Sequence, residues 1–469
     1  MAHTVSNYPT AFYIPELSSL EARKGKKKNF EIEKETISEI GATLLQEGLK
    51  LVRTASSYPR DYLIEVNGKT LIPNAFTTEE EKRLVQQCDE WAYNWSVYSG
   101  LNAQTDLNRR CDGLQEGPWE TVYTPKSFRD LRFQFSSKEA DWADVPLKGG
   151  NIIFSKGCAF VSKHQFNVFF EYLIRSKKLG FLKPPEQMKL TDEKIRKVAR
   201  RMFLTGKLEK KPDPLATWDL LTEACIQNRK DPSVSILRQL KNQLKIPELV
   251  VEHEEIVMFL HAEKVAKDLL AKLLGVDSLL LVPSMSYHLD FSIAAGPDNK
   301  IFIQDHEASL LTLRLIDEKK LPPSDLPILK QLLETAEASA DAFQKKTEEI
   351  AEIVFKAGFE PIRTPGTFFC SPIGEEPLCG AIHFLNAIFG QSPKDREHYF
   401  ITSKVKIGEK LGAALMASFE DFVLEHLPRN TRIHFVGRGE DLFTNTGPQA
   451  GPRCYTSPIF TSQEESKKD

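Results

Sequence analysis

Two spacings of apolar side chains along the chain predict its strands and its helices. Apolar runs between Tyr58 and Ala75 lie on both sides of Asn67-Gly68, a pair of residues that suits a tight β-hairpin turn. A second pair of apolar strands is expected at 145–161, and a third hairpin is expected to turn at Gly-Pro-Asp-Asn, residues 296–299. These three segments predict small antiparallel units along the chain.

The apolar spacing becomes helical at residue 162. Phe166, Phe169, Phe170 and Leu173 fall on one stripe of a helix, and Lys-rich helical sequence continues to about residue 245. We therefore expect 162–245 to be a helical insertion.

After residue 245 the chain follows a loose repeat of a helix, a strand and a strand hairpin. Helices are expected at 262–274, at about 327–357 and at about 409–427, and a short apolar strand follows each. Each repeat would cover a small sheet with one helix. If the repeats surround an axis, the loop before each second strand reaches the centre.

These patterns divide the chain into five parts. We predict an N-terminal extension (1–54), the first part of an α/β domain (55–161), the helical insertion (162–245), the remainder of the α/β domain (246–462) and a polar tail (463–469).

Composition narrows the class of protein. Hydrophobic residues make up 41%, charged residues 27%, and the formal charge is −3, so we expect an ordinary globular protein without a general field for nucleic acid or anionic membrane. No stretch approaches 18 apolar residues and no signal peptide is recognisable, so residence in the cytoplasm is expected. The seven cysteines are scattered and odd in number, which favours free thiols in a reducing compartment.

Metal and cofactor binding are not expected from the sequence. It contains neither Cys-x-x-Cys nor His-Glu-x-x-His, and His253 with His261 is interpreted as part of a helix surface or core. Metal binding is therefore disfavoured, and no cofactor is predicted.

Candidate chemistry lies in two segments. His288 and Asp290 are two residues apart on an expected strand, where alternate side chains point to the same face. Cys454 follows a glycine-containing loop near the C-terminus, next to Arg453, whose charge would favour a thiolate. A thiol, an imidazole and a carboxylate are therefore candidates for one site.

Four short motifs, taken in order, resemble a known superfamily. They are Pro-Arg-Asp61, Gly-Gly-Asn151, His288-Leu-Asp290 and Ala-Gly-Pro-Arg-Cys454-Tyr-Thr. Together they resemble the guanidino-group-modifying enzymes, which include amidinotransferases and the arginine, agmatine and protein-arginine deiminases. The hairpin after residue 58 and the segment HLDFSIAAGP are most similar to amidinotransferases, and the cysteine loop is similar to both groups.

The resemblance, which spans about residues 55–462, implies a fold and a site. The fold would be an α/β five-bladed propeller (pentein) of ββαβ-like modules with a helical insertion. Cys454 would attack the guanidino carbon to give a covalent thiouronium, His288 would transfer protons, and Asn151 would take the third catalytic position. Asp61 and Asp290 would bind the guanidinium. Water as the second nucleophile would make a deiminase, and an amine would make an amidinotransferase.

Two positions depart from the superfamily's pattern. Asn151 stands where an acid usually orients the histidine, and Lys148 stands where deiminases often carry Glu. An amide cannot stabilise imidazolium by charge, so Asp130, Asp141 or Asp144 could substitute. Gln449 occupies the place where free-arginine deiminases tend to have an Arg that holds the substrate carboxylate, which disfavours free arginine as a deiminase substrate.

Three functions remain open from the sequence. The leading hypothesis is amidino transfer from arginine or a related guanidine to an amine. Hydrolysis of a guanidine, such as peptidyl arginine or an agmatine-like amine, is the first alternative. The second is a degenerate pentein that binds a protein partner through the helical insertion. A papain-like or transglutaminase-like hydrolase is disfavoured by the order of the motifs. The expected partner is a guanidino small molecule or peptidyl arginine, with no cofactor, metal, nucleic acid or membrane.

Overall fold

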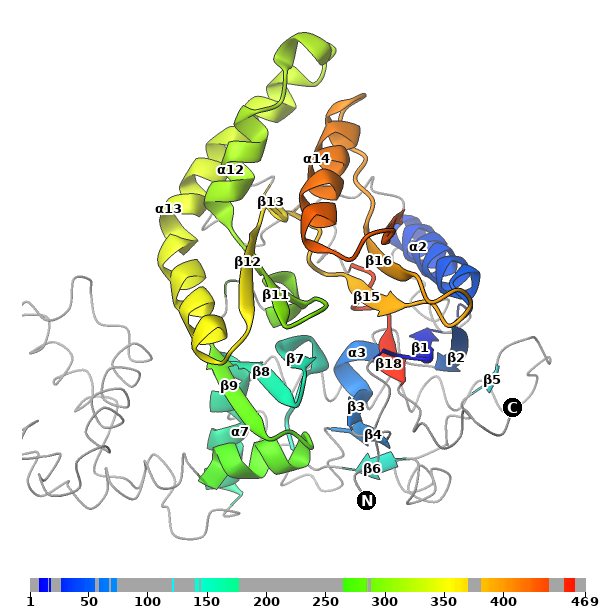
Figure 1. Cartoon of the computed structure of the whole chain (residues 1–469), viewed down its shortest axis with the longest axis vertical. Helices are drawn as coiled ribbons and strands as arrows, with labels where there is room; N and C mark the ends of the chain where they lie inside the picture. The colour runs from blue at the N-terminus through cyan, green and yellow to red at the C-terminus, as the bar shows by residue number, and fades with distance from the viewer. Residues whose placement is uncertain are drawn as a thin grey trace, which may run out of the picture. The chain divides into compact units, whose positions relative to one another are not determined.

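The computed structural model describes residues 8–15, 17, 27–54, 59–66, 69–73, 120–121, 140–142, 145–176, 265–283, 285, 288–369, 381–437 and 451–459. They form an α/β fold of small mixed sheets and helices (Figure 1). The chain separates into two compact units, one of residues 1–167 with 274–469 and one of residues 168–273. Every residue of the candidate site lies in the first unit.

The elements of the first half of the chain are β1 (Ala11–Pro15), α2 (Lys27–Gln46), β2 (Lys50–Thr54), α3 (Pro59–Tyr62), β3 (Ile64–Val66), β4 (Lys69–Ile72), β5 (Glu120–Thr121), β6 (Ala140–Trp142), β7 (Ile152–Ser155), β8 (Cys158–Ser162) and α7 (Lys163–Arg175). The second half has β9 (Ser278–Val282), β10 (Ile293–Ala295), β11 (Lys300–Gln304), α12 (His306–Arg314), α13 (Leu326–Lys356), β12 (Glu360–Thr364), β13 (Thr367–Phe369), β14 (Ala381–His383), β15 (Ile388–Gln391), β16 (His398–Ser403), α14 (Leu411–His426), β17 (Arg432–Val436) and β18 (Ser457–Ile459). A further helix covers 265–273.

Five of the sheets in the described part of the chain share one pairing pattern. In each, the first strand is antiparallel to the second, and the second is parallel to the third. The five sets are β3-β4-β6, β7-β8-β9, β10-β11-β12, β15-β16-β17 and β18-β1-β2. The common pattern identifies a repeated structural module.

The last strand of the chain pairs with the first. β18 is antiparallel to β1, with Ala11 opposite Ile459, and β1 is parallel to β2. Residues 11–15 and 50–54, which the sequence assigned to an N-terminal extension, therefore lie in a sheet that also contains the C-terminal strand. No local sequence pattern indicates such a pairing, because the two strands are separated by most of the chain.

The three predicted hairpins are present. β3 and β4 flank residues 67–68, β7 pairs with β8, and β10 pairs with β11. Positive φ angles at Asp298 (51°) and Asn299 (67°) make the tight turn between β10 and β11, as the turn chemistry predicted. Helix α7 begins at Lys163, next to residue 162, where the apolar spacing becomes helical, and α13 and α14 lie within a few residues of their predicted ranges. Predictions on residues 177–264, most of the helical insertion, lie outside the described residues.

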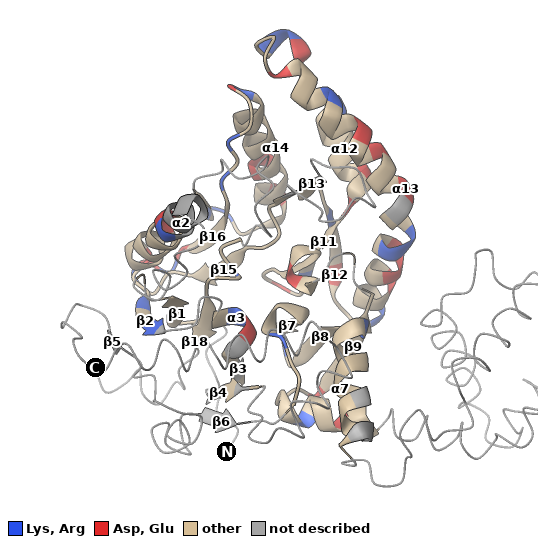
Figure 2. Ribbon diagram, turned by 180° about the vertical axis from the view of Figure 1, so that it is seen from behind, with Lys and Arg blue, Asp and Glu red and all other residues tan. Residues whose placement is uncertain are grey.

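The apolar faces of α13 and α14 pack over the sheets that contain β11, β12 and β16. Phe302, Phe384, Phe400 and Phe419 belong to this buried cluster. Basic and acidic residues are both present along the ribbon of α13 (Figure 2), and Lys356 forms an ion pair with Glu352. The sign of charge is therefore mixed along this helix, as expected for a solvated face. No helix in the described part of the chain is long and apolar enough to cross a membrane.

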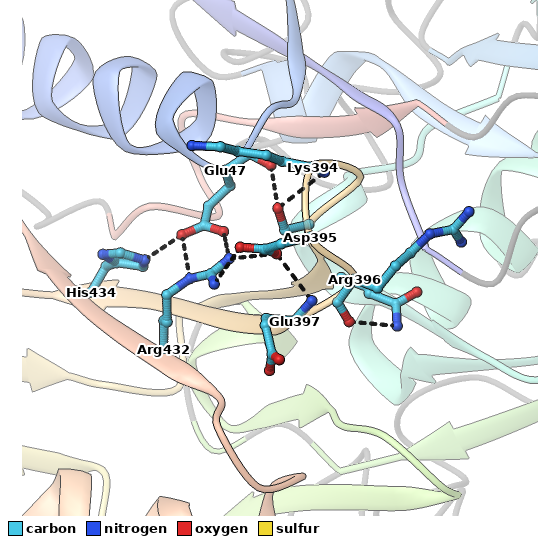
Figure 3. A network of polar contacts seen from close by, with 9 residues as sticks. Glu47, Lys394, Asp395, Arg396, Glu397, Arg432 and His434 are labelled. Carbon is cyan, nitrogen blue, oxygen red and sulfur yellow. Dashed lines mark hydrogen bonds and ion pairs between the residues drawn. The ribbon is translucent and has the colours of Figure 1, made fainter.

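A buried carboxylate joins α2 to β17. Glu47, which directly follows α2 and is 1% exposed, accepts hydrogen bonds from Arg432 and contacts Nε2 of His434 at 2.8 Å (Figure 3). Arg432 also donates to Asp395 at 2.8 Å, and the hydrogen bonds to Glu47 and then Asp395 raise the pKa of Arg432. This network, the Glu47 clamp, fixes the helix to the β15-β16-β17 sheet.

Candidate active site

Helical turns just before the first strands of four modules carry four of the five predicted site residues. Asp61 lies in α3 before β3, and Asn151 ends a 3-10 turn before β7. Asp290 lies in a 3-10 turn before β10, and Cys454 lies in the turn before β18. His288, the fifth residue, directly precedes the turn of Asp290. In each of these four modules, the segment before the first strand therefore carries the candidate site residues.

The prediction that His288 and Asp290 lie on a strand is wrong. His288 is extended, but Leu289–Phe291 form a 3-10 turn, in which the amide of Ser292 donates to the carbonyl of Leu289 at 2.8 Å, and β10 begins only at Ile293. The two-residue strand period does not apply to a turn. After the turn, the chain continues as β10, which pairs with β11.

The structure brings His288, Asp290 and Cys454 together. One ligand-type atom of each residue, a ring nitrogen, a carboxylate oxygen and the sulfur, lies within 4.8 Å of those of the other two. Their exposed fractions are 7%, 0% and 7%. A thiol, an imidazole and a carboxylate therefore share one buried place.

The carboxylate of Asp290 is the least satisfied polar group of the site. Both oxygens are buried and accept no hydrogen bond from the described residues, and Nε of Arg453 lies 3.8 Å from Oδ2. Burial raises the pKa of Asp290, against the opposing charges of His288, Arg453 and Arg60. A buried acceptor without a donor is costly, so this carboxylate is suited to a ligand rich in donors.

Asp61 lies against the imidazole. Its Oδ1 accepts a hydrogen bond from the amide of Gly150 at 3.1 Å, and its Oδ2 is 3.9 Å from Nε2 of His288. The sequence assigned Asp61 to substrate binding and left the histidine without an acid from the Gly-Gly-Asn motif. The structure places a carboxylate beside that histidine, and the carboxylate comes from another module.

Asn151 holds the backbone next to the histidine. Its Oδ1 accepts a hydrogen bond from the amide of Leu289 at 3.2 Å, and the residue is buried. Of the acids considered as substitutes, Asp141 lies on β6, while residues 130 and 144 lie outside the described residues. Residue 449 is also outside them, so its effect on substrate choice stays a prediction.

The surroundings of Cys454 disfavour its thiolate. Burial raises its pKa well above the ordinary value, and the charges of Asp290 and Asp61 raise it further. A hydrogen bond from Nδ2 of Asn386 to Sγ, at 3.2 Å, acts in the opposite direction. The thiol therefore needs either a base or an added positive charge to become a nucleophile.

The sequence analysis missed Asn386. It lies just before β15, in the segment AIHFLNAIFG, and so it occupies in its module the place that Asp61, Asn151, Asp290 and Cys454 occupy in theirs. The repeat was recognised from the sequence, and extending it to this module would have identified Asn386.

Two arginines lie inside the site. Burial, and then the like charge of Arg453, lower the pKa of Arg60 to about 9, while Asp290, Asp61 and Cys454 oppose this. Burial lowers the pKa of Arg453, and the charges of Asp290 and Cys454 oppose this. Their positive charges partly balance the negative charge of the two carboxylates in this buried place.

The same three residues are the candidate metal ligands. Within the described residues, His288, Asp290 and Cys454 are the only group of three or more His, Cys, Asp or Glu side chains whose ligand atoms lie this close together. Nitrogen, oxygen and sulfur are all donors that Zn²⁺ accepts. The absence of a resident metal stays a prediction from the sequence.

Solved structures similar to this chain include deiminases and amidinotransferases. An agmatine deiminase from C. jejuni is 12% identical, with a TM-score of 0.37, over 98% of this chain and 96% of that chain. An amidinotransferase from Microseira wollei, in saxitoxin biosynthesis, is 11% identical, with a TM-score of 0.33, over 97% and 96%. The inosamine-phosphate amidinotransferase of Streptomyces griseus is 10% identical, with a TM-score of 0.33, over 97% and 96%.

No protein-family model matches the chain, and no curated protein matches it. The similar structures belong to the two groups of enzymes that the sequence motifs resemble.

Proposed function

We propose that this protein modifies guanidino groups and that Cys454 is its nucleophile. The observation that carries the proposal is the buried carboxylate of Asp290, which accepts no hydrogen bond from the described residues and lies within 4.8 Å of a thiol and an imidazole. The site therefore combines an acceptor for a cation with the groups that would attack it.

A guanidinium fits this acceptor because it is planar, positively charged and carries only donors. Two of its N–H groups can bond side-on to one carboxylate. A guanidinium held in this way by Asp290 has its carbon next to Sγ of Cys454. Its charge also favours the thiolate, which offsets the effect of Asp290 and Asp61 on the pKa of the thiol.

The proton balance of the first step involves His288. The imidazole takes the proton of the Cys454 thiol, and Sγ forms a bond to the guanidino carbon. His288 then gives that proton to the nitrogen that leaves as an amine, and a thiouronium remains on the cysteine. Asp61, with Oδ2 3.9 Å from Nε2 of His288, stabilises the imidazolium between these two transfers.

The second step distinguishes two reactions. His288 removes a proton from the incoming nucleophile, which attacks the thiouronium carbon and displaces the thiol. With an amine as the nucleophile the product is a new guanidine. In the hydrolytic reaction the nitrogen that leaves in the first step is ammonia, the substituted nitrogen stays on the thiouronium, and water then gives a ureido compound. We favour amidino transfer, because the hairpin after residue 58 and the segment HLDFSIAAGP resemble amidinotransferases, and we keep hydrolysis as the alternative.

The five sheets of common pairing are inferred to be the blades of a five-bladed α/β propeller. Two observations support this arrangement. Each sheet is preceded by a turn that carries one of Asp61, Asn151, Asp290, Asn386 and Cys454, and the pairing of β18 with β1 joins the two ends of the chain in one sheet. A ring of five modules would direct all five turns to its axis.

Labelled guanidines provide the test of this function. The full chain is incubated with arginine, agmatine and a peptidyl arginine, each with and without glycine or another amine. New guanidines that require the amine indicate transfer, and citrulline or another ureido product indicates hydrolysis. Cys454→Ser should abolish either product, whereas Cys158→Ser, which changes the other described free cysteine, should leave it unchanged.

Covalent labelling provides an independent check. A haloacetamidine carries a guanidinium-like cation and an electrophilic carbon, so it should label Cys454 selectively. Arginine should protect this residue from labelling. No turnover of any guanidine, together with equal labelling of several cysteines, would overturn the proposal in favour of a binding module.

A further inference from the structure

We propose that Asn386 is a positioning residue for Cys454, which holds the turn that carries the cysteine and directs Sγ toward the substrate. The inference rests on the proposed function, because it assigns this role in the same reaction. None of the sequence motifs contains Asn386, and it comes from a module that supplies no predicted site residue.

Three hydrogen bonds join Asn386 to the cysteine turn. Its Oδ1 accepts from the amides of Arg453 at 3.1 Å and of Cys454 at 3.3 Å, and its Nδ2 donates to Sγ of Cys454 at 3.2 Å. Because two N–H groups occupy the oxygen, the amide has one orientation, with its nitrogen toward the sulfur. The side chain therefore recognises both the backbone and the thiol of the cysteine.

Tight packing fixes this contact. Asn386 is 0% exposed, and the cysteine turn passes so close to it that a β-carbon at Gly451 would lie 2.5 Å from Oδ1. The turn that carries Asn386 is anchored separately, since Oγ1 of Thr402 on β16 donates to the carbonyl of Phe384 at 2.6 Å. Both partners are thus held before any substrate arrives, as a preorganised site requires.

The donor has an electrostatic role. Burial, Asp290 and Asp61 all favour the neutral thiol, and the two carboxylates repel a negative charge on Sγ. An N–H group directed at the sulfur favours the thiolate, because a hydrogen bond to a charged acceptor is stronger than one to a neutral acceptor. Asn386 therefore counteracts the effect of the two carboxylates on the thiol, and the carboxylates remain available to bind the cation.

Asn386→Asp separates the two functions of the amide. The aspartate keeps an oxygen for the two backbone amides, but it replaces the donor that faces Sγ with an acceptor. The experiment measures the rate of alkylation of Cys454 by iodoacetamide against pH, by mass spectrometry of its peptide. We expect the midpoint of the profile to rise by at least about one pH unit, and the rate at pH 7.5 to fall at least about tenfold.

Thr402→Val is the matched control. It removes a hydrogen bond from the same turn without touching the thiol, so it should lower the melting temperature and leave the alkylation midpoint unchanged. If Asn386→Asp does not fold, Asn386→Ala tests the same donor and should move the midpoint in the same direction. In turnover, the Asn386 variants should lower kcat with little change in KM.

The outcomes separate the inference from the proposed function. Alkylation requires no guanidine, so a protein that turns over no guanidine would overturn the function while the midpoints still decide the role of Asn386. Midpoints equal to that of the unaltered protein in both Asn386 variants would overturn the inference, even if the enzyme is active. A raised midpoint in the Asn386 variants, with an unchanged one in Thr402→Val, supports it.

Discussion

The backbone of Gly150 lies directly against the imidazole of His288. A β-carbon added at Gly150 would lie 2.6 Å from Nδ1, a separation that no side chain tolerates without movement. The amide of the same glycine donates to Asp61, so one residue fixes the acid and leaves room for the ring. The glycine is therefore needed because another chain segment approaches closely, and not for an unusual backbone angle.

Gly150→Ala should displace the imidazole and leave the fold largely intact. A displacement of about 1 Å at a reacting group can cost about 100-fold in rate. We expect a loss of kcat of that order, measured by turnover and compared with the circular dichroism spectrum. Gly41→Ala is the control, because a β-carbon there would meet side chains at an ordinary 3.4 Å and should not change kcat. Unchanged turnover in Gly150→Ala would exclude His288 from the reaction.

Asp290→Asn should make the protein more stable and less active. Burial raises the pKa of Asp290, so the folded state disfavours its charge, and removing the charge should stabilise the fold by about 1–3 kcal/mol at neutral pH. This gain should disappear as the pH falls and the unaltered Asp290 becomes protonated. The loss of the cation's partner should lower kcat/KM at least about 100-fold.

The measurements for Asp290→Asn are urea unfolding at several pH values and turnover. Asp298→Asn, at an exposed turn position of the same hairpin with φ of 51°, is the control and should change neither. A lower stability at neutral pH in Asp290→Asn would contradict the account of Asp290 as an unsatisfied anion.

Two histidines with lowered pKa values should make the protein sensitive to acid. Burial lowers the pKa of His306 to about 4, and burial with the charge of His306 lowers that of His383 to about 3. The unfolded chain then binds more protons than the folded chain below about pH 6.5. Stability should fall as the pH falls from about 6.5 to about 4, by about 1.4 kcal/mol per pH unit for each histidine.

Denaturant unfolding at pH 7, 6, 5 and 4.5 measures this slope. His306→Gln should reduce it by about half, because one of the two histidines no longer titrates. His164→Gln, at an exposed position on α7, should leave the slope unchanged. A slope that is the same in all three proteins would show that neither of the two histidines controls acid stability.

The Glu47 clamp should contribute more to stability than a surface ion pair. Glu47→Ala removes the buried partner of the partly exposed Arg432 and His434, while Arg432 keeps Asp395, and a loss of about 1–3 kcal/mol is expected. Glu337→Ala removes an ion pair with Arg314 in which both side chains are 56% exposed, and exposed pairs contribute about 0–1 kcal/mol. Thermal and urea unfolding of the two variants should differ accordingly, and equal losses would contradict the role of the clamp.

Local chemistry made much of the fold predictable. Turn residues such as Asp298 and Asn299 adopt positive φ without a large cost, and the apolar period of α13 and α14 is a property of their own sequences. The turns that carry the site residues were harder to predict from the sequence. The segment through Asp290, predicted as a strand, is a 3-10 turn, and β10 begins only after it.

Pairings between strands that are distant in the sequence could not be predicted from local chemistry. The antiparallel pairing of β1 with β18 depends on hydrogen bonds between backbone groups. Every residue type has these groups, so the amino-acid sequence of one strand does not identify its partner strand. For the same reason the sequence treated the first 54 residues as an extension.

The sequence by itself determined which groups are available for chemistry: the thiol of Cys454, the imidazole of His288, and the carboxylates of Asp61 and Asp290, each beside glycine or a turn. Only the tertiary structure decided how they are matched. It placed Asp61 beside His288, left Asp290 without a hydrogen-bond donor among the described residues, and brought Asn386 within hydrogen-bonding distance of the thiol. Charge, burial and hydrogen bonding act over a few ångströms, and distances of that kind between remote segments exist only after the chain has folded.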